Sequence, residues 1–197
     1  MKKNKLRTKD LIYAGAFAAL YIIAMFIIVM LFGMIPILYI MTPFFVGVLS
    51  ATIYMMYVTK IKKFGAILIL SLLFGLIMSS SGHGITVLLC LPIGLIGELI
   101  AKLGKYQSKK MFSLSYLVFN LTMVAPFGNL YMASNSFIEH CNEYYGEAYG
   151  AAVKNILETY GNSLILIQIA LAIIGAGIGV VLASMLFKKH FQKAGIV

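Results

Sequence analysis

The feature that most constrains this chain is a long stretch without charge. From Leu11 to Thr59 there is no Asp, Glu, Lys or Arg. A helix needs about 20 apolar residues to cross a bilayer, so the stretch has room for two spans. The first apolar run is too long for the core of a cleaved signal peptide and predicts a retained helix. Only 11% of the whole chain is charged, against about 25% in soluble domains, which also favours a membrane protein.

Six apolar segments can be marked along the chain, at about 11–33, 37–59, 64–80, 85–101, 112–132 and 162–187. They are longer than the roughly ten-residue alternating strands of a membrane barrel, so helices are expected. The predicted fold is an all-α integral membrane protein. We expect one domain, residues 1–197, forming a compact bundle of six transmembrane helices.

Basic residues are distributed in a way that predicts orientation. In a six-span arrangement fifteen of the sixteen lie on one side: Lys2, Lys3, Lys5, Arg7, Lys9, Lys60, Lys62, Lys63, Lys102, Lys105, Lys109, Lys110, Lys188, Lys189 and Lys193. By the positive-inside rule both termini are then cytoplasmic. The net charge of +10 faces anionic lipid and does not indicate nucleic-acid binding.

The segment 133–161 is the one sizeable connection on the predicted outer side. Its apolar residues follow a period of 3.6, while Glu139, Glu143 and Glu147 follow four-residue steps on another face. This pattern predicts an amphipathic helix over the outer end of the bundle. Two interpretations remain open, a solvated surface helix packed on the bundle or a lid over a ligand site.

The sequence "SSSGHG", residues 79–84, pairs serine with histidine and so raises the question of an enzyme. A membrane phosphatase would also need arginine and lysine to hold phosphate, yet Arg7 is the single arginine and is predicted to be cytoplasmic. Glu98 lies four residues before Lys102, which favours a simple ion pair. Cys90 and Cys141 lack the spacing of a metal site. We therefore assign no catalytic residue, metal or resident cofactor, and keep an outer-face hydrolase only as a distant alternative.

Polar residues in the predicted outer half are the candidates for substrate binding. They are Ser80, Ser81, His83, Asn120, Asn129, Tyr131 and Gln168. Buried polar groups need partners, which are either each other or a bound small molecule. Pro126 would free a backbone carbonyl at this depth. With Lys154 as the sole outer cation, a neutral or weakly charged, partly aromatic nutrient fits better than a phosphorylated one. Because His83, His140 and several tyrosines share this side, haem is a minority candidate.

Small residues recur at four-residue steps on the first and last helices. Ala14 and Ala18 form one such pair and Gly15 and Ala19 another, while Gly175, Gly179 and Ala183 follow the same step near the end of the chain. Small residues allow helices to approach closely. Either stripe can serve packing within the bundle or contact with a partner protein.

Several landmarks together resemble a known family. They are "TKDLIYAGAFAALY", "KKFGAI", the "GH" that follows, "GKYQSKK" and the ending "KKHFQKAGIV". The chain resembles the substrate-binding S-components of energy-coupling factor (ECF) transporters, in their Trep_Strep or MptD-like branch, over essentially its whole length. That resemblance implies a multi-pass protein of the bacterial cell membrane that captures a vitamin-like micronutrient at the outer face.

The same resemblance implies partners. An S-component docks on a membrane T-component through its first helix, where Ala14, Gly15, Ala18 and Ala19 would contribute, and two ABC ATPases supply the energy. The S-component is thought to topple in the membrane, and nearly charge-free spans would make that less costly. The alternative from another class is a standalone membrane carrier or an assembly subunit.

Overall fold

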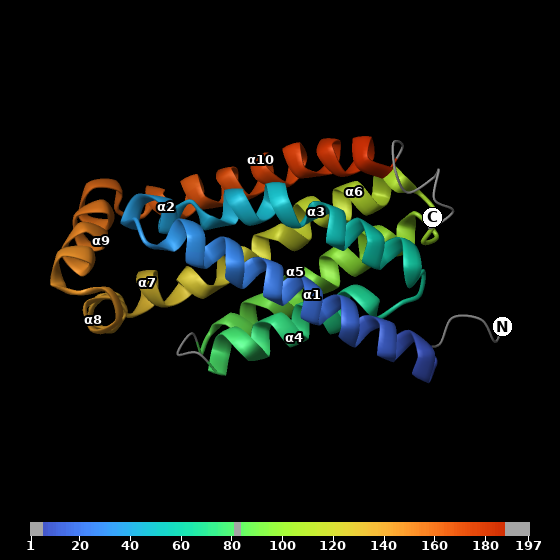
Figure 1. The fold of residues 1–197 in the computed structure, drawn as a ribbon, viewed down its shortest axis with the longest axis horizontal. Helices are drawn as coiled ribbons and strands as arrows, with labels where there is room; N and C mark the ends of the chain where they lie inside the picture. Colours follow the sequence, from blue (N-terminus) through green and yellow to red (C-terminus); the bar gives the residue numbers. More distant parts are fainter. Residues whose placement is uncertain (1–5, 81–83, 188–197) are drawn as a thin grey trace.

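The computed structural model describes residues 6–80 and 84–187. Within them the chain is helical and has no strand (Figure 1). The elements are α1 Thr8–Gly33, α2 Pro36–Ile40, α3 Thr42–Lys60, α4 Ala66–Ser80, α5 Thr86–Leu103, α6 Lys109–Phe119, the 3-10 turns η1 Asn120–Met123 and η2 Ala125–Phe127, α7 Gly128–Met132, α8 Ser134–Tyr145, α9 Glu147–Tyr160 and α10 Ser163–Leu186.

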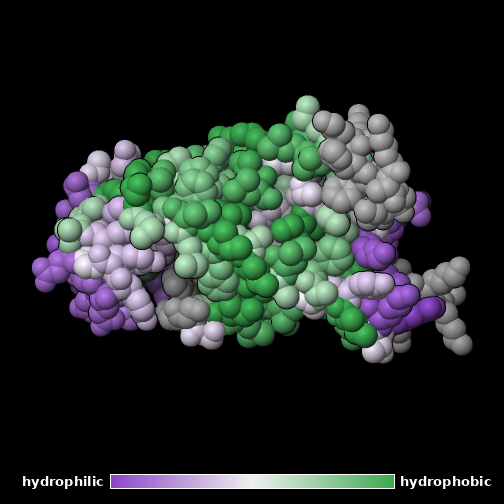
Figure 2. Space-filling model, in the orientation of Figure 1, coloured by the Kyte–Doolittle hydropathy of each residue, from purple (hydrophilic) through white to green (hydrophobic). Residues whose placement is uncertain are grey.

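Five stretches of the described chain are long and apolar enough to cross a membrane. They are α1, α3, α5, the run from Lys109 to Met132, and α10. The sixth expected segment, α4, has 15 residues, or about 22 Å at 1.5 Å per residue. Figure 2 shows apolar residues across the middle of the face in view, with hydrophilic residues gathered toward both ends. The arrangement is that of a multi-pass membrane protein.

Three expected helices are interrupted. The segment 37–59 divides into α2 and α3, because Pro43 at the start of α3 lacks the N–H that a continuous helix needs. The segment 112–132 passes through η1 and η2, and Pro126 lies in the second of these turns. The outer segment 133–161 forms two helices rather than one, since Gly146 adopts a φ of +89° between α8 and α9.

The closest helix packing is between α3 and α10. A Cβ atom added to Gly179 would lie 2.2 Å from the carbonyl oxygen of Gly47, and one added to Gly175 would lie 2.3 Å from that of Phe44. Glycine alone permits this approach of the two backbones. Asn120 Nδ2 donates to the carbonyls of Pro43 and Ala172, at 3.0 and 2.8 Å, and so joins η1 to both helices. The stripe on the last helix therefore serves packing within the bundle.

The small residues of α1 are divided between two environments. Ala14 and Ala18 are buried, 1% and 2% exposed, on the side of α1 that packs on α3 and α4. Gly15 and Ala19 are exposed, and a Cβ on Gly15 would meet nothing within 4 Å. Of the predicted docking set, only Gly15 and Ala19 remain accessible in the isolated chain, because the bundle itself covers the other two.

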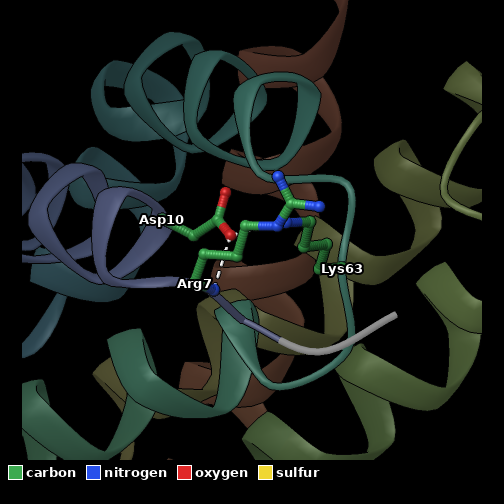
Figure 3. A network of polar contacts seen from close by, with 3 residues as sticks. All are labelled: Arg7, Asp10 and Lys63. Carbon is green, nitrogen blue, oxygen red and sulfur yellow. Dashed lines mark hydrogen bonds and ion pairs between the residues drawn. The ribbon is translucent and has the colours of Figure 1, made fainter. Parts of the chain in front are cut away.

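One end of the bundle collects the basic residues of the described chain other than Lys154. The start of α1, the end of α3 and the turn between α5 and α6 meet there, opposite α8 and α9 (Figure 1). Figure 3 shows the contact between the start of α1 and the turn that follows α3. Lys63 Nζ lies 2.5 Å from Asp10 Oδ2, and the same oxygen accepts a hydrogen bond from the backbone N–H of Arg7 at 2.7 Å. Lys154 lies in α9 at the opposite end.

Glu98 corrects an expectation. Its carboxylate is fully buried and accepts hydrogen bonds from the backbone N–H groups of Ile67 and Leu68, at 2.9 and 3.2 Å. The predicted ion pair with Lys102 is therefore wrong. The Lys102 ammonium lies over the ring of Phe64 instead, 5.3 Å from its centroid. Glu98 satisfies donors of the first turn of α4, which no helical carbonyl can reach.

Candidate functional site: a two-chambered cavity beneath α8

A cavity lies at the end of the bundle that α8 covers. Its outer chamber has a volume of about 790 Å³. Side chains from α1, α2, α4, α7 and α8 meet around it, so residues far apart in the sequence form the chamber together. Its lining residues are Phe26, Tyr39, Ser80, Asn129, Ala133, Ser136, Phe137, His140, Cys141, Tyr144 and Tyr145.

A smaller inner chamber of about 180 Å³ adjoins the outer one toward the middle of the bundle. Phe26, Tyr39 and Tyr145 line both chambers and therefore stand between them. The other lining residues are Met25, Val29, Thr42, Val46, Phe74, Met78, Met123, Pro126 and Phe127. The 3-10 turns at Asn120–Phe127 place Met123 and Pro126 here.

The roof of the cavity is the apolar face of α8. Phe137 and Cys141, one turn apart, are both buried and both line the outer chamber. Phe137 packs on Tyr39 with a ring-centroid distance of 6.3 Å. The helical periodicity of this segment therefore reflects a face that covers the cavity.

The neighbouring helix α9 anchors the roof. The Tyr149 hydroxyl donates to the carbonyl of Gly33 at the end of α1, at 2.6 Å. The Tyr149 ring also stacks on Tyr145, the last residue of α8, with centroids 4.5 Å apart. The turn at Gly146 brings these two tyrosines together and so links the roof to the end of α1.

Two of the predicted binding residues line this cavity. Ser80, at the end of α4, and Asn129, in α7, both face the outer chamber. His140, considered as a haem ligand, also lines it. Ser81 and His83 lie outside the described residues.

The other three candidates hydrogen-bond to protein groups away from the lining. Asn120 joins η1 to α3 and α10, as described above. The Tyr131 hydroxyl donates to Gln168 Oε1 at 2.7 Å, and Gln168 Nε2 donates to the carbonyl of Ile40 at 3.1 Å. Their role in binding a substrate stays a prediction, and the contacts found here hold α7, α10 and α2 together.

Sequence reasoning missed the aromatic walls of the cavity. Phe26 and Tyr39 lie in apolar runs in which every neighbour is also apolar, so nothing marks them as lining residues. Ser136 lies in the outer segment 133–161, where polar residues are common and do not stand out. The one available signal was the Pro36 break before Tyr39, which turns the chain at the cavity end.

The lining combines aromatic and apolar side chains with a few polar groups. Among the described residues no Asp, Glu, Lys or Arg borders either chamber, and no group of three His, Cys, Asp or Glu side chains could hold a metal ion. Burial raises the pKa of the Cys141 thiol to about 11, so the thiol is neutral at neutral pH. Aromatic and apolar side chains with a few polar groups are typical of small-molecule sites.

Comparison with known proteins supplies the family. Neither the curated proteins nor the solved structures compared with this chain gave a match. The family Trep_Strep, described as a hypothetical bacterial integral membrane protein, matches residues 8–193. That match takes in every helix of the fold and both chambers of the cavity. The chain therefore belongs to the Trep_Strep family of bacterial integral membrane proteins.

Proposed function

We propose that this protein is the substrate-capturing S-component of an ECF-type importer, taking up a vitamin-like or related micronutrient. The observation that carries the proposal is the two-chambered cavity at one end of a multi-pass membrane protein, opposite the end that collects the basic residues. A site open to one side of the membrane only is what a capture subunit needs.

Orientation follows from charge. By the positive-inside rule the end with Lys60, Lys63 and Lys102 is cytoplasmic, and with it the start of α1. The cavity and its α8 roof then face outward. For six crossings α4 would also span, and a 15-residue helix does so where the bilayer is thin or its flanking residues reach the interface.

Energy has to come from partners. Among the described residues α1, α3, α5 and α10 contain almost no charge in their central turns, which leaves no relay for protons or ions. We propose a T-component and two ABC ATPases as the partners, with ATP hydrolysis in the latter and no catalysis by this chain. The resemblance to S-components, seen in the landmarks along the sequence, supports this assignment.

The docking face on α1 is the side that carries Gly15 and Ala19. Both are exposed, and Gly15 leaves open space above the helix. Close approach of a second helix is favoured at such positions. Ala14 and Ala18 lie on the adjoining, buried side of α1 and support docking through the packing of the bundle.

Affinity purification of the tagged protein from its native membrane tests the proposal. We expect an integral T-component and two ATPases to co-purify. Ala19→Trp should abolish their recovery, while Val181→Trp, placed at an exposed position on α10, should leave it intact. Ala18→Trp is a third variant, which tests packing within the bundle. It should destabilise the isolated protein, because the Ala18 side chain is buried. Purification of the folded protein without any ATPase would contradict the proposal.

A further inference from the structure

The two chambers differ in the groups they offer to a ligand. The outer chamber has polar side chains on several sides, Ser80, Asn129, Ser136 and His140. The inner chamber has Thr42 and the two shared tyrosines, and otherwise only apolar side chains. The Thr42 hydroxyl already donates to the carbonyl of Tyr39 at 2.7 Å. A ligand in the inner chamber therefore meets hydrocarbon, aromatic rings and thioethers.

Charge on the ligand would find no acidic or basic partner among the described residues of either chamber. The described lining contains no acidic or basic side chain, and His140 is the only residue there that could become a cation. Its Nδ1 lies 3.7 Å from Glu143 Oε2 on the solvent side of α8. Burying a charge without a partner is costly. The cavity therefore favours an uncharged molecule.

The size and composition of the inner chamber favour an aromatic or compact apolar group. An engineered apolar cavity of about 150 Å³ is known to accommodate benzene, and the inner chamber measures about 180 Å³. Met25, Met78 and Met123 border it together with Phe74 and Phe127. Methionine thioethers adapt to irregular shapes and make favourable contacts with aromatic rings.

We propose that the cavity binds an uncharged amphiphilic molecule, whose single or small fused ring occupies the inner chamber and whose polar end lies in the outer chamber beneath α8. The transport of that molecule rests on the function proposed above, whereas its binding does not. The aromatic residues common to both chambers, Phe26, Tyr39 and Tyr145, would contact the molecule where its ring joins its polar end.

A series of three indoles tests this ligand class with the purified full chain in detergent. Indole-3-acetamide, indole-3-acetate and tryptamine share one ring system and are neutral, anionic and cationic. The chain contains no tryptophan, so the indole emission reports the ligand alone, and its blue shift reports entry into an apolar site. We expect the amide to bind at least about tenfold more tightly than either charged analogue.

Substitutions locate the site. Val29→Phe adds a ring to the wall of the inner chamber and should weaken amide binding by about tenfold or more. Ile27→Phe, two residues away on an exposed position of α1, is the matched control and should change nothing. Ser136→Lys adds a cation to the outer chamber. It should strengthen acetate binding about fivefold relative to amide binding.

Equal binding of the three indoles, or loss of amide binding in both phenylalanine variants, would overturn the proposed ligand class. So would the absence of any blue-shifted emission with the amide. None of these outcomes depends on a T-component or an ATPase. Failure to recover those partners from the native membrane would overturn the transport role and leave the ligand class standing.

Discussion

Tyr106 donates a hydrogen bond from its hydroxyl to Glu98 Oε1 at 2.8 Å, while the other carboxylate oxygen of Glu98 caps the start of α4. Lys105 and Tyr106 both adopt positive φ, 52° and 54°, in the turn that makes this contact. Left-handed backbone is unusual outside glycine. One buried acid thus fixes the α5–α6 turn and the first turn of α4 at the basic end of the bundle.

Replacing Glu98 with alanine should lower the free energy of unfolding by about 2–4 kcal/mol, since the buried N–H groups of Ile67 and Leu68 lose their acceptor. Tyr106→Phe should cost about 1–2 kcal/mol, because only one hydrogen bond is lost. Unfolding in detergent, followed by circular dichroism, measures both. Lys102→Gln is the control and should cost under about 1 kcal/mol. An equal loss in Lys102→Gln would favour the ion pair that the structure lacks.

The α3–α10 contact makes a second prediction about stability. Gly179→Ala would force a Cβ to within 2.2 Å of the Gly47 carbonyl oxygen, and should cost about 3 kcal/mol or more. Gly177→Ala is the matched control two residues away, where a Cβ meets nothing within 4 Å. It should be neutral or stabilise the protein by about 0.5–1 kcal/mol, through helix propensity. Equal thermal stability of the two variants would contradict the packing described here.

The long apolar helices were the part of the fold that sequence could predict. Segments 11–33 and 162–187 agree closely with α1 and α10, because hydropathy over such lengths directly reflects the thickness of the bilayer. The breaks at Met41 and at Asn120–Phe127 were less accessible. A proline marks a region where a helix weakens, yet the surrounding packing decides which residue leaves the helix.

The cavity was predicted only at its polar edge. Ser80 and Asn129 were found because polar residues are rare in apolar segments. Asn120, Tyr131 and Gln168 carry the same signal and hydrogen-bond to partners distant in sequence, and their part in binding stays a prediction. Periodicity assigned one helix to 133–161, since it does not register the backbone turn at Gly146.

Gln168 distinguishes a structural role from a binding role. Gln168→Ala removes the acceptor of the Tyr131 hydroxyl and the donor to the Ile40 carbonyl, and should cost about 2–3 kcal/mol of stability. Binding of indole-3-acetamide to the folded fraction should stay within about twofold, since neither chamber includes Gln168. The control is Asn129→Ala, which should weaken binding. A large loss of binding in Gln168→Ala at unchanged stability would place it in the site.

Alkylation of Cys141 should depend on pH in a way that reflects its burial. A thiol reacts as the thiolate, and burial raises the pKa of Cys141 to about 11. The protonated form therefore dominates below that pH, and the labelling rate should keep rising about tenfold per pH unit past the usual thiol pKa of about 8.5. Mass spectrometry after maleimide treatment measures the rate. Cys141→Ser is the control. It should show almost no labelling, because the remaining cysteine, Cys90, is fully buried. A plateau near pH 8.5 would indicate an open roof.

The same reaction tests Gly146 as the element that sets the roof in place. Its φ of +89° and ψ of 161° belong to a region of backbone conformation that residues with side chains avoid. Gly146→Ala should therefore cost about 1–3 kcal/mol in backbone strain. No steric clash adds to this cost, because a Cβ at this position would meet nothing within 4 Å. Loosening α8 by about 1.4 kcal/mol would expose Cys141 about tenfold more often and speed its labelling by the same factor. Gly84→Ala, which also has open space and no positive φ, is the control and should label at the original rate. Unchanged labelling in Gly146→Ala would show that Tyr149 and the apolar face of α8 hold the roof without this turn.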